Sequence, residues 1–295
     1  MSKIISIVTP SYNQGIFISN TIKSIISQEG DFYLDYIIQD GGSTDTTLDV
    51  ISYFEHKLLL GSRRQSDFGH EWLTPAADDS VIRCRGVSFR WQSGKDAGQS
   101  QAINKGFGEA WGGLAGWVNS DDSLLPGALT RVADLFQRQA SVYFGKSKAI
   151  DQNGNEKWIQ DFWKTKYTFY DSFYLGYAPP QPSVFFPLRL YRELGGLDEN
   201  LHYMLDTDLW QRMLLKIGYF SYVPEIWSIQ TYHPASKSMQ GDHLFSAFEG
   251  EKRELRKTRG RQIGKKRALF ALRFWLRMVY LNIIEWLKNI YHLCR

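Results

Sequence analysis

The 295-residue chain has the length of one large α/β domain, or of one domain with an appendage. Hydrophobic residues make up 43% of it, which excludes a disordered chain and allows a sizeable core. The two cysteines, Cys84 and Cys294, show no metal-binding spacing, and no signal peptide precedes the first apolar run. These features predict a protein of the reducing cytosol.

Charge is divided unevenly along the chain. Residues 251–295 hold 13 Lys and Arg against 3 Asp and Glu, a net charge of +10, whereas the remaining residues carry −6. A basic tail on a mildly acidic body indicates an anionic partner for the tail. No nucleic-acid recognition motif accompanies the charge, so we expect an anionic membrane surface and no nucleic acid.

Strand and helix patterns alternate over the first 120 residues. An apolar run at 4–8 ends in Thr9 and Pro10, and isoleucines follow at helical spacing over 18–26. A second strand ends at Asp40, where two glycines predict a tight turn. The same plan recurs over 86–122. This order predicts a mostly parallel sheet, whose ligands bind outside the carboxyl ends of the strands.

The second half has a more mixed pattern. Asn153 and Gly154 predict the turn of a hairpin. The run at 204–218 predicts a helix with acidic residues in its first turn and Gly218 at its end. Residues 55–85 fit neither pattern and are interpreted as an insertion.

Several polar and aromatic side chains fall at or just after the predicted strand ends. They are Thr9, Tyr12, Asp40, Asp96, Asp121 and Asp122. Two adjacent carboxylates at the end of a buried strand repel each other, so they are favourable there only with a cation or a hydrogen-bond network. Helix capping is the simpler alternative for such a pair.

Five motifs together resemble a known family. "VTPSYNQ", "DGGSTD", "DAGQSQAINKG", "WVNSDD" and "DTDLWQRM" stand in the order and at the approximate spacing of family 2 glycosyltransferases. The resemblance spans roughly residues 4–240. It implies an inverting enzyme of the GT-A fold, an α/β fold with a Rossmann-like, mostly parallel central sheet and helices on both faces.

The resemblance also implies a division of the chain. Residues 1–245 would form the glycosyltransferase domain, with a nucleotide-sugar-binding half at 1–122 and an acceptor-binding half at 123–245. Residues 246–295 would form a basic amphipathic helical tail.

The resemblance places a nucleotide-sugar donor across the strand ends. Tyr12 would stack on the base, and Thr9 and Pro10 would shape the same pocket. Asp40 would accept a hydrogen bond from the ring N–H of the base, which favours UDP- or dTDP-sugars. Family members often carry a second acid after this aspartate, and here Gly41 stands in its place.

Further residues would contact the rest of the donor. The resemblance places Asp96 and Asn104 near the ribose and diphosphate, and Ser120 at the ribose. Lys237, in a segment that resembles a loop closing over the diphosphate, would contact a phosphate. For Asp96 and Asn104, stabilisation of a turn is the alternative role.

A divalent cation is implied at the double aspartate. Asp121 falls where the family has its metal-binding acid, and Asn119 replaces the first acid of the Asp-x-Asp signature. Mg²⁺ or Mn²⁺ would bridge the diphosphate. Asp122 would tune Asp121 or share the cation, and His233 would be a neutral imidazole ligand.

Inversion requires a base that takes the proton of the acceptor hydroxyl. The family pattern puts this base at Asp206, with Leu205 replacing a frequent Glu. Asp208 is the second candidate, and it points to another side of the predicted helix.

Two other functions remain open at this stage. A nucleotidyltransferase would use a similar nucleotide and metal site, but it would need an early phosphate loop that the sequence lacks. A non-catalytic protein that binds nucleotide-sugar or scaffolds at the membrane is favoured by Asn119 and Leu205, the two departures from the family pattern.

The tail predicts an association with membranes. Apolar residues share one helical face over 269–290, and Arg273 and Arg277 argue against a spanning helix. A helix lying in the membrane interface is expected, with the acceptor a lipid-linked saccharide or envelope polysaccharide at the cytosolic face of the inner or plasma membrane. Packing on the body or on a second copy in a homo-oligomer is the alternative.

Overall fold

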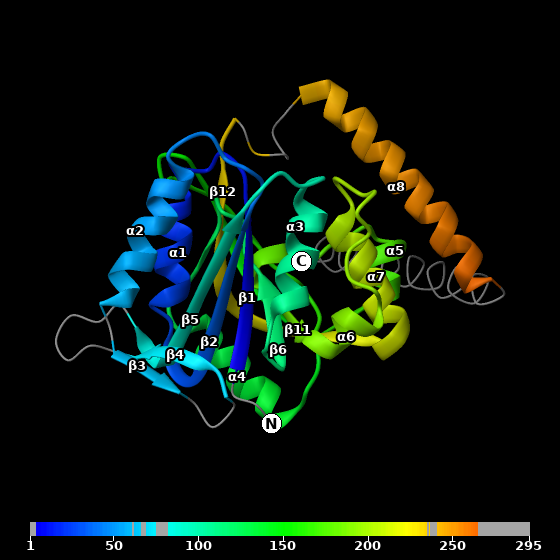
Figure 1. Ribbon diagram of the computed structural model, residues 1–295. Helices are drawn as coiled ribbons and strands as arrows, with labels where there is room; N and C mark the ends of the chain where they lie inside the picture. Colours follow the sequence, from blue (N-terminus) through cyan, green and yellow to red (C-terminus); the bar gives the residue numbers. More distant parts are fainter. Residues whose placement is uncertain are drawn as a thin grey trace, which may run out of the picture.

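Helices cover both faces of one mixed sheet (Figure 1). The structure is a computed structural model that describes residues 4–60, 62–65, 69–74, 82–234, 236 and 241–264. Its strands are β1 (Ile4–Ser11), β2 (Glu29–Asp40), β3 (Ser62–Gln65), β4 (Glu71–Thr74), β5 (Arg83–Ser93), β6 (Leu114–Trp117), β7 (Ser123–Leu124), β8 (Tyr143–Asp151), β9 (Glu156–Gln160), β10 (Lys166–Thr168), β11 (Val184–Pro187) and β12 (Tyr219–Tyr232). Its helices are α1 (Ile18–Ile26), α2 (Thr47–Leu59), α3 (Gln99–Glu109), α4 (Ala128–Arg138), α5 (Phe169–Phe173), α6 (Leu188–Glu193), α7 (Leu205–Ile217) and α8 (Gly241–Ile263).

The first half of the chain forms the parallel part of the sheet. The strand order is β10-β12-β8-β11-β6-β1-β2-β5-β4-β3, and the pairs among β6, β1, β2 and β5 are parallel. The register sets Ser11 opposite Asp40, and Asp40 opposite Ser93. The loops that follow these strands therefore meet at one edge, as the alternation of elements predicts.

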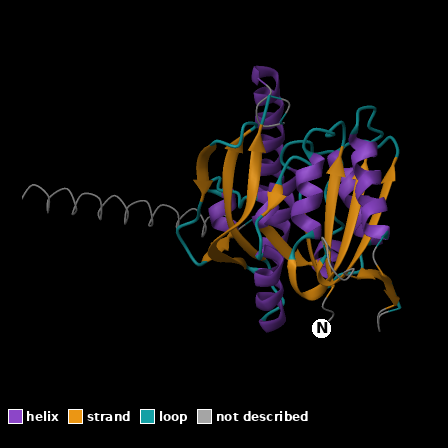
Figure 2. Cartoon of the chain, turned by 90° about the vertical axis from the view of Figure 1, so that its left-hand side faces the viewer, coloured by secondary structure: helices purple, strands orange, loops and turns teal. Residues whose placement is uncertain are grey.

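Each face of the sheet has its own core. Alternate residues of a strand point to opposite faces, so Ile5 and Ile7 of β1 pack with α1, α2 and α4, whereas Val8 packs with α3 and α7. Figure 2 shows the strands side by side with the helices packed against them. The two cores fix the strand ends, and with them the loops that carry the polar side chains.

The second half adds antiparallel strands. β11 joins β6 to β8, and β12 runs parallel to β8. β8 and β9 form the predicted hairpin, and Gly154 adopts the positive φ of 84° that its turn requires. The predicted helix at 204–218 is α7, which ends at Gly218 with φ 89°. The expected insertion at 55–85 contains the end of α2 and the β3–β4 hairpin, which extends the sheet edge beyond β5.

Part of the predicted tail packs on the body. Helix α8 begins at Gly241, before the expected boundary at 245, and lies beside α5 and α7 (Figure 1). Leu255 and Ile263, eight residues apart on one face, are buried. The amphipathic helix predicted over 269–290 lies outside the described residues. Within the described ranges, no helix is both long and apolar enough to cross a membrane.

Candidate active site

Two loops at the carboxyl edge of the sheet are tied together by hydrogen bonds. Asn13, with φ 51°, donates its N–H to the Ser43 hydroxyl over 2.8 Å. The Asn13 side-chain oxygen accepts the N–H of Thr44 over 2.9 Å. The loops after β1 and β2 thereby form one rigid rim.

Asp40 organises this rim. Its Oδ2 accepts the N–H groups of Gly42 and Ser43 over 3.0 and 2.8 Å and the Ser93 hydroxyl over 2.7 Å. Its Oδ1 accepts the Ser43 hydroxyl over 2.5 Å. A carboxylate oxygen can accept more than one hydrogen bond, so Oδ1 keeps acceptor capacity for a further donor. The side chain is buried, and much of its role is to hold the turn.

The residues expected near the base differ in their surroundings. Tyr12, directly after β1, is 61% exposed, so its ring is open for stacking. Thr9 is fully buried, and its hydroxyl accepts a hydrogen bond from Tyr36 over 3.1 Å. Thr9 therefore holds the strand inside the sheet rather than lining a pocket. Pro10 is also buried within β1.

The Asp96 carboxylate lies beside Gly41, the position where family members often carry a second acid. A Cβ placed on Gly41 would lie 3.1 Å from Asp96 Oδ2, so glycine at this position lets the Asp96 carboxylate approach the turn. Oδ1 of Asp96 accepts the N–H of Gly98 over 2.9 Å. Asp96 thus supplies a carboxylate next to Asp40 from a different strand end.

Asn104 does not face the donor edge as expected. Its side-chain nitrogen donates to the Leu197 carbonyl and to Glu199, each over 3.0 Å. Its oxygen accepts the Leu197 N–H and the Tyr191 hydroxyl over 2.9 and 2.5 Å. The carboxamide is therefore engaged by the 191–199 loop, which matches the alternative role of stabilising a turn.

Asp121 and His233 come together from positions 112 residues apart. His233 Nε2 lies 3.2 Å from Asp121 Oδ2. The imidazole is buried and stacks on Phe17, with ring centroids 4.2 Å apart. The Ser236 hydroxyl accepts the His233 N–H over 3.0 Å. The ring is therefore fixed in place by its own loop and by the loop before α1.

Asp122 turns away from this pair. Its carboxylate accepts the N–H of Thr231 over 3.2 Å and the Asn119 side-chain amide over 3.4 Å. Burial raises the pKa of Asp122 well above its ordinary value, and the charge of Asp121 raises it further. Asp122 therefore anchors the motif to β12 while Asp121 faces the histidine.

Hydrogen bonds from α1, α3 and the turn at 181–183 hold the other residues of the 117–122 segment. The carbonyl of buried Ser120 accepts the Thr21 hydroxyl over 2.9 Å, and Gln99 donates to the Asn119 oxygen over 2.7 Å. Gln181 donates to the Trp117 carbonyl over 2.7 Å, while its own buried oxygen has no partner among the described residues. Phe17, Gln99 and Gln181 escape sequence analysis because their types and spacing match ordinary loop residues.

The side chains around Asp121 supply only some of the ligands that a divalent cation needs. No three His, Cys, Asp or Glu side chains of the described residues form a group that could hold a metal by themselves. Asp121 and His233 supply one carboxylate oxygen and one imidazole nitrogen at adjacent positions. Mg²⁺ typically uses one or two protein carboxylates plus substrate phosphates, so these two side chains fit a cation completed by a diphosphate. Lys237 lies outside the described residues.

The first turn of α7 lies beside the end of β6. Trp210 of α7 stacks on Trp117, the last residue of β6, with ring centroids 5.2 Å apart. The Ser100 hydroxyl of α3 donates to the carbonyl of Leu201, just before α7, over 3.0 Å. These contacts bring Asp206 to the side of the edge that carries the double aspartate.

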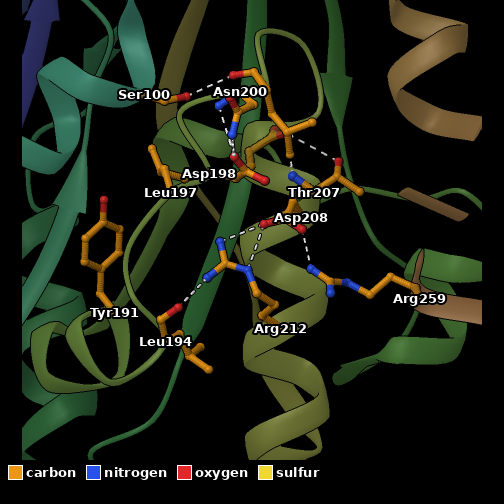
Figure 3. Close-up of polar contacts among 12 residues, drawn as sticks. Ser100, Tyr191, Leu194, Leu197, Asp198, Asn200, Thr207, Asp208, Arg212 and Arg259 are labelled. Carbon is orange, nitrogen blue, oxygen red and sulfur yellow. Dashed lines mark hydrogen bonds and ion pairs between the residues drawn. The ribbon is translucent and has the colours of Figure 1, made fainter. Parts of the chain in front are cut away.

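Asp206 and Asp208 have different environments within this helix. Asp206 Oδ1 accepts the N–H and the hydroxyl of Thr207 over 2.6 and 3.3 Å, and burial raises its pKa. Asp208 is buried between two arginines, with Arg212 Nε at 2.8 Å and Arg259 on its other oxygen (Figure 3). Asp206 keeps the acceptor capacity that a base needs, whereas Asp208 is engaged in an ion-pair network.

A residue of α8 caps the start of α7. The Glu251 carboxylate accepts the N–H groups of His202, Tyr203 and Met204 over 2.9, 2.9 and 3.0 Å. Unpaired N–H groups at a helix start favour such an anion. Helix α8 therefore holds the turn that carries Asp206.

The sequence matches the model of one protein family. The model, described as glycosyl transferase family 2, matches residues 6–72 and 73–192, which is more than half of the chain. The chain belongs to glycosyl transferase family 2. The motifs noted in the sequence lie mostly within this range, and the resemblance that they indicated is confirmed.

Relatives by sequence are distant. The chain is 23% identical over 252 residues to an uncharacterized protein of Mycobacterium tuberculosis, covering 80% of this chain and 69% of that one. It is 26% identical over 156 residues to an uncharacterized glycosyltransferase of Nostoc, covering 50% of this chain and 40% of the relative.

Solved structures of this family share the fold. TarS of Staphylococcus aureus, residues 1–349 in complex with UDP-GlcNAc, is 18% identical with a TM-score of 0.58, covering 83% of this chain and 61% of that one. The mannosyltransferase PcManGT of Pyrobaculum calidifontis, in complex with GDP-Man and Mn²⁺, is 14% identical with a TM-score of 0.57, covering 88% and 65%. The GT-A fold is thereby confirmed. The chain spans about two thirds of these structures and 37% of another TarS chain.

Proposed function

We propose that this family 2 member is an inverting glycosyltransferase that moves a sugar from a nucleotide-sugar to an acceptor hydroxyl. The observation that carries the proposal is the position of Asp206. This half-buried carboxyl, with a raised pKa, lies in the first turn of α7. Trp210 of the same helix stacks on Trp117 at the end of β6, the strand that leads into the Asp121–His233 pair. A donor site and a base on facing elements are what sugar transfer requires.

The donor lies across the loops after β1, β2 and β5 in this proposal. The exposed Tyr12 ring stacks on the base, and Asp40 Oδ1 accepts its ring N–H, which favours uracil or thymine. Asp96, beside Gly41, lies within reach of the ribose. Complexes of TarS with UDP-GlcNAc and of PcManGT with GDP-Man support a nucleotide-sugar as donor.

Asp121 and His233 would hold Mg²⁺ or Mn²⁺ together with the diphosphate. Such a cation, when bound, would offset the negative charge that develops on the departing nucleotide. Asp122 and Asn119 keep the Asp121 loop on β12, so that the carboxylate stays opposite the imidazole. The Mn²⁺ in the PcManGT complex supports a divalent cation in this family.

Asp206 takes the proton from the acceptor hydroxyl as it attacks the anomeric carbon. A base works best when its pKa is close to the working pH, and burial moves the pKa of Asp206 in that direction. Such a base contributes about 10²–10⁴-fold to the rate. The acceptor is a lipid-linked or polysaccharide hydroxyl at the cytosolic face of the membrane, where the basic tail would attach the protein.

Hydrolysis of a panel of UDP-, dTDP- and GDP-sugars tests this function. Wild type should release one nucleotide slowly with Mn²⁺ and not with chelator, because water replaces the absent acceptor. Asp121→Asn should lose the release, and Asp134→Asn, on the exposed side of α4, should keep it. Absence of both release and metal-dependent binding for every donor would overturn the donor site and favour a scaffolding role.

A further inference from the structure

A basic groove runs between α5 and α8, apart from the donor edge. It encloses about 850 Å³, and its walls include Phe173 and Tyr174 from α5 and Lys252, Arg253, Arg256 and Arg261 from α8. Lys252 and Arg256 form one row along α8, and Arg253, Lys257 and Arg261 form a second row beside it, with neighbours in a row four residues apart. The groove thus has an aromatic wall and a cationic wall.

The charges of the groove are poorly neutralised. Lys252 pairs with Glu249 over 2.7 Å, and Lys257 pairs with Glu254 over 2.6 Å. In the described part of the chain, Arg253, Arg256 and Arg261 form no ion pair within 4.0 Å. A guanidinium fork matches the oxygens of a phosphoryl group and binds it in a bidentate manner.

The opposite face of α8 packs on the body, whereas Arg253, Arg256 and Arg261 are exposed. Glu251, Leu255, Arg259 and Ile263 recur every four residues and bind α8 to the body, with Glu251 on the turn before α7 and Arg259 on Asp208. This docking holds the flanking rows of α8 against α5. The cations are therefore held in a fixed position rather than on a free helix.

The groove also adjoins the helix that carries the base. On α5, Ser172 accepts a hydrogen bond from Gln211 of α7 over 3.1 Å, and the next two residues, Phe173 and Tyr174, line the groove. Helix α7 therefore carries Asp206 in its first turn and contacts α5, one of the two helices that line the groove. The groove therefore lies in the second half of the chain, the half that the resemblance assigns to the acceptor.

We infer that the α5–α8 groove binds a phosphoryl group carried by the acceptor, so that the acceptor is a phosphate-bearing saccharide. The inference rests on the proposed function. The arginines pair with the phosphoryl oxygens, and the aromatic wall packs on the adjoining sugar. The phosphoryl group has the same chemistry in a lipid-linked and in a water-soluble saccharide.

The experiment compares the full-length protein with Arg253→Glu/Arg256→Glu and with Lys57→Glu/Arg138→Glu, a control with the same change of charge at exposed positions of α2 and α4. Calorimetry measures binding of glucose 1-phosphate and of the uncharged methyl glucoside, with Mg²⁺ and saturating UDP present so that the donor site is filled. Wild type and control should bind only the phosphate. The groove variant should bind it at least about tenfold more weakly, the loss expected for a charge-assisted contact.

Equal binding of both sugars, or unchanged phosphate binding by the groove variant, would overturn the inference. Sedimentation with equal parts phosphatidylglycerol and phosphatidylcholine separates the membrane alternative. If the groove variant loses only vesicle binding, the groove is a lipid site and the inference fails. Donor hydrolysis, measured alongside, should be unchanged by the groove variant. Its absence already in wild type would overturn the proposed function without deciding the phosphate binding.

Discussion

Asp206 shows how the fold shifts one carboxyl toward the chemistry of a base. The side chain lies in the first turn of α7, where helix N–H groups favour an anion, yet burial outweighs this and raises its pKa. Glu251 accepts the N–H groups of residues 202–204, just before this turn. The ionised form of Asp206 is therefore less stable in the folded protein than in water.

This environment predicts that Asp206→Asn stabilises the fold at neutral pH. A carboxyl whose pKa is raised by folding stabilises the native state only below its ordinary range, and this contribution is lost as the pH rises through the folded pKa. The asparagine oxygen still accepts the Thr207 N–H. We expect a gain of about 0.5–2 kcal/mol at pH 8, the usual size for a stabilising substitution, which disappears near pH 3. Urea unfolding at both pH values measures it, and a loss at pH 8 would contradict the account.

The sequence predicts the contacts of some site residues better than those of others. The resemblance predicts Asp121 and His233 as ligands of one cation, and the structure sets these two side chains 3.2 Å apart, while the metal site stays a prediction. For Asn104 the sequence left two roles open, and its hydrogen bonds to the loop near residue 197 match the turn-stabilising alternative, although no local pattern identifies these partners. The role of Asp206 remains a prediction.

The α7–α8 contact joins the helix of the proposed base to a segment that the sequence suggested to be a separate tail. A basic run with few apolar residues gives no sign of docking, because the buried stripe of α8 contains one charged anchor, Arg259, between Leu255 and Ile263. The partner of this arginine, Asp208, lies 51 residues away. Long-range pairing of this kind cannot be read from helical periodicity alone.

Asp208→Asn should therefore destabilise the protein. It leaves Arg259 as a buried cation without a full partner, which costs about 3 kcal/mol. In Asp208→Leu/Arg259→Met, which removes both charges, most of the loss should be recovered. Urea unfolding of the three proteins at pH 7 tests the network. If Asp208→Asn abolished turnover with unchanged unfolding free energy, Asp208 and not Asp206 would be the base.

At the level of the whole molecule, the fold was the most predictable feature. Alternating strands and helices predict a parallel sheet with its loops at one edge, and β1, β2 and β5 pair in this way. The β3–β4 hairpin was missed because residues 55–85 lack strand alternation, and it adds to the sheet edge away from the site. Within the acceptor half, the hairpin, the strand and short helix at 184–193 and α7 were predictable from local patterns, whereas their assembly depends on long-range contacts.

The proposed mechanism needs both a donor site and a base. Mutation of Asp206 should remove the base and leave the donor site intact. The most direct measurement is donor affinity and nucleotide release for wild type and Asp206→Asn, using the nucleotide-sugar and cation selected by the panel. We predict an unchanged dissociation constant and a release rate lower by about 10²–10⁴-fold, because only proton transfer is lost. Release by Asp206→Asn at the wild-type rate would contradict the assignment of the base, and with it the proposed mechanism.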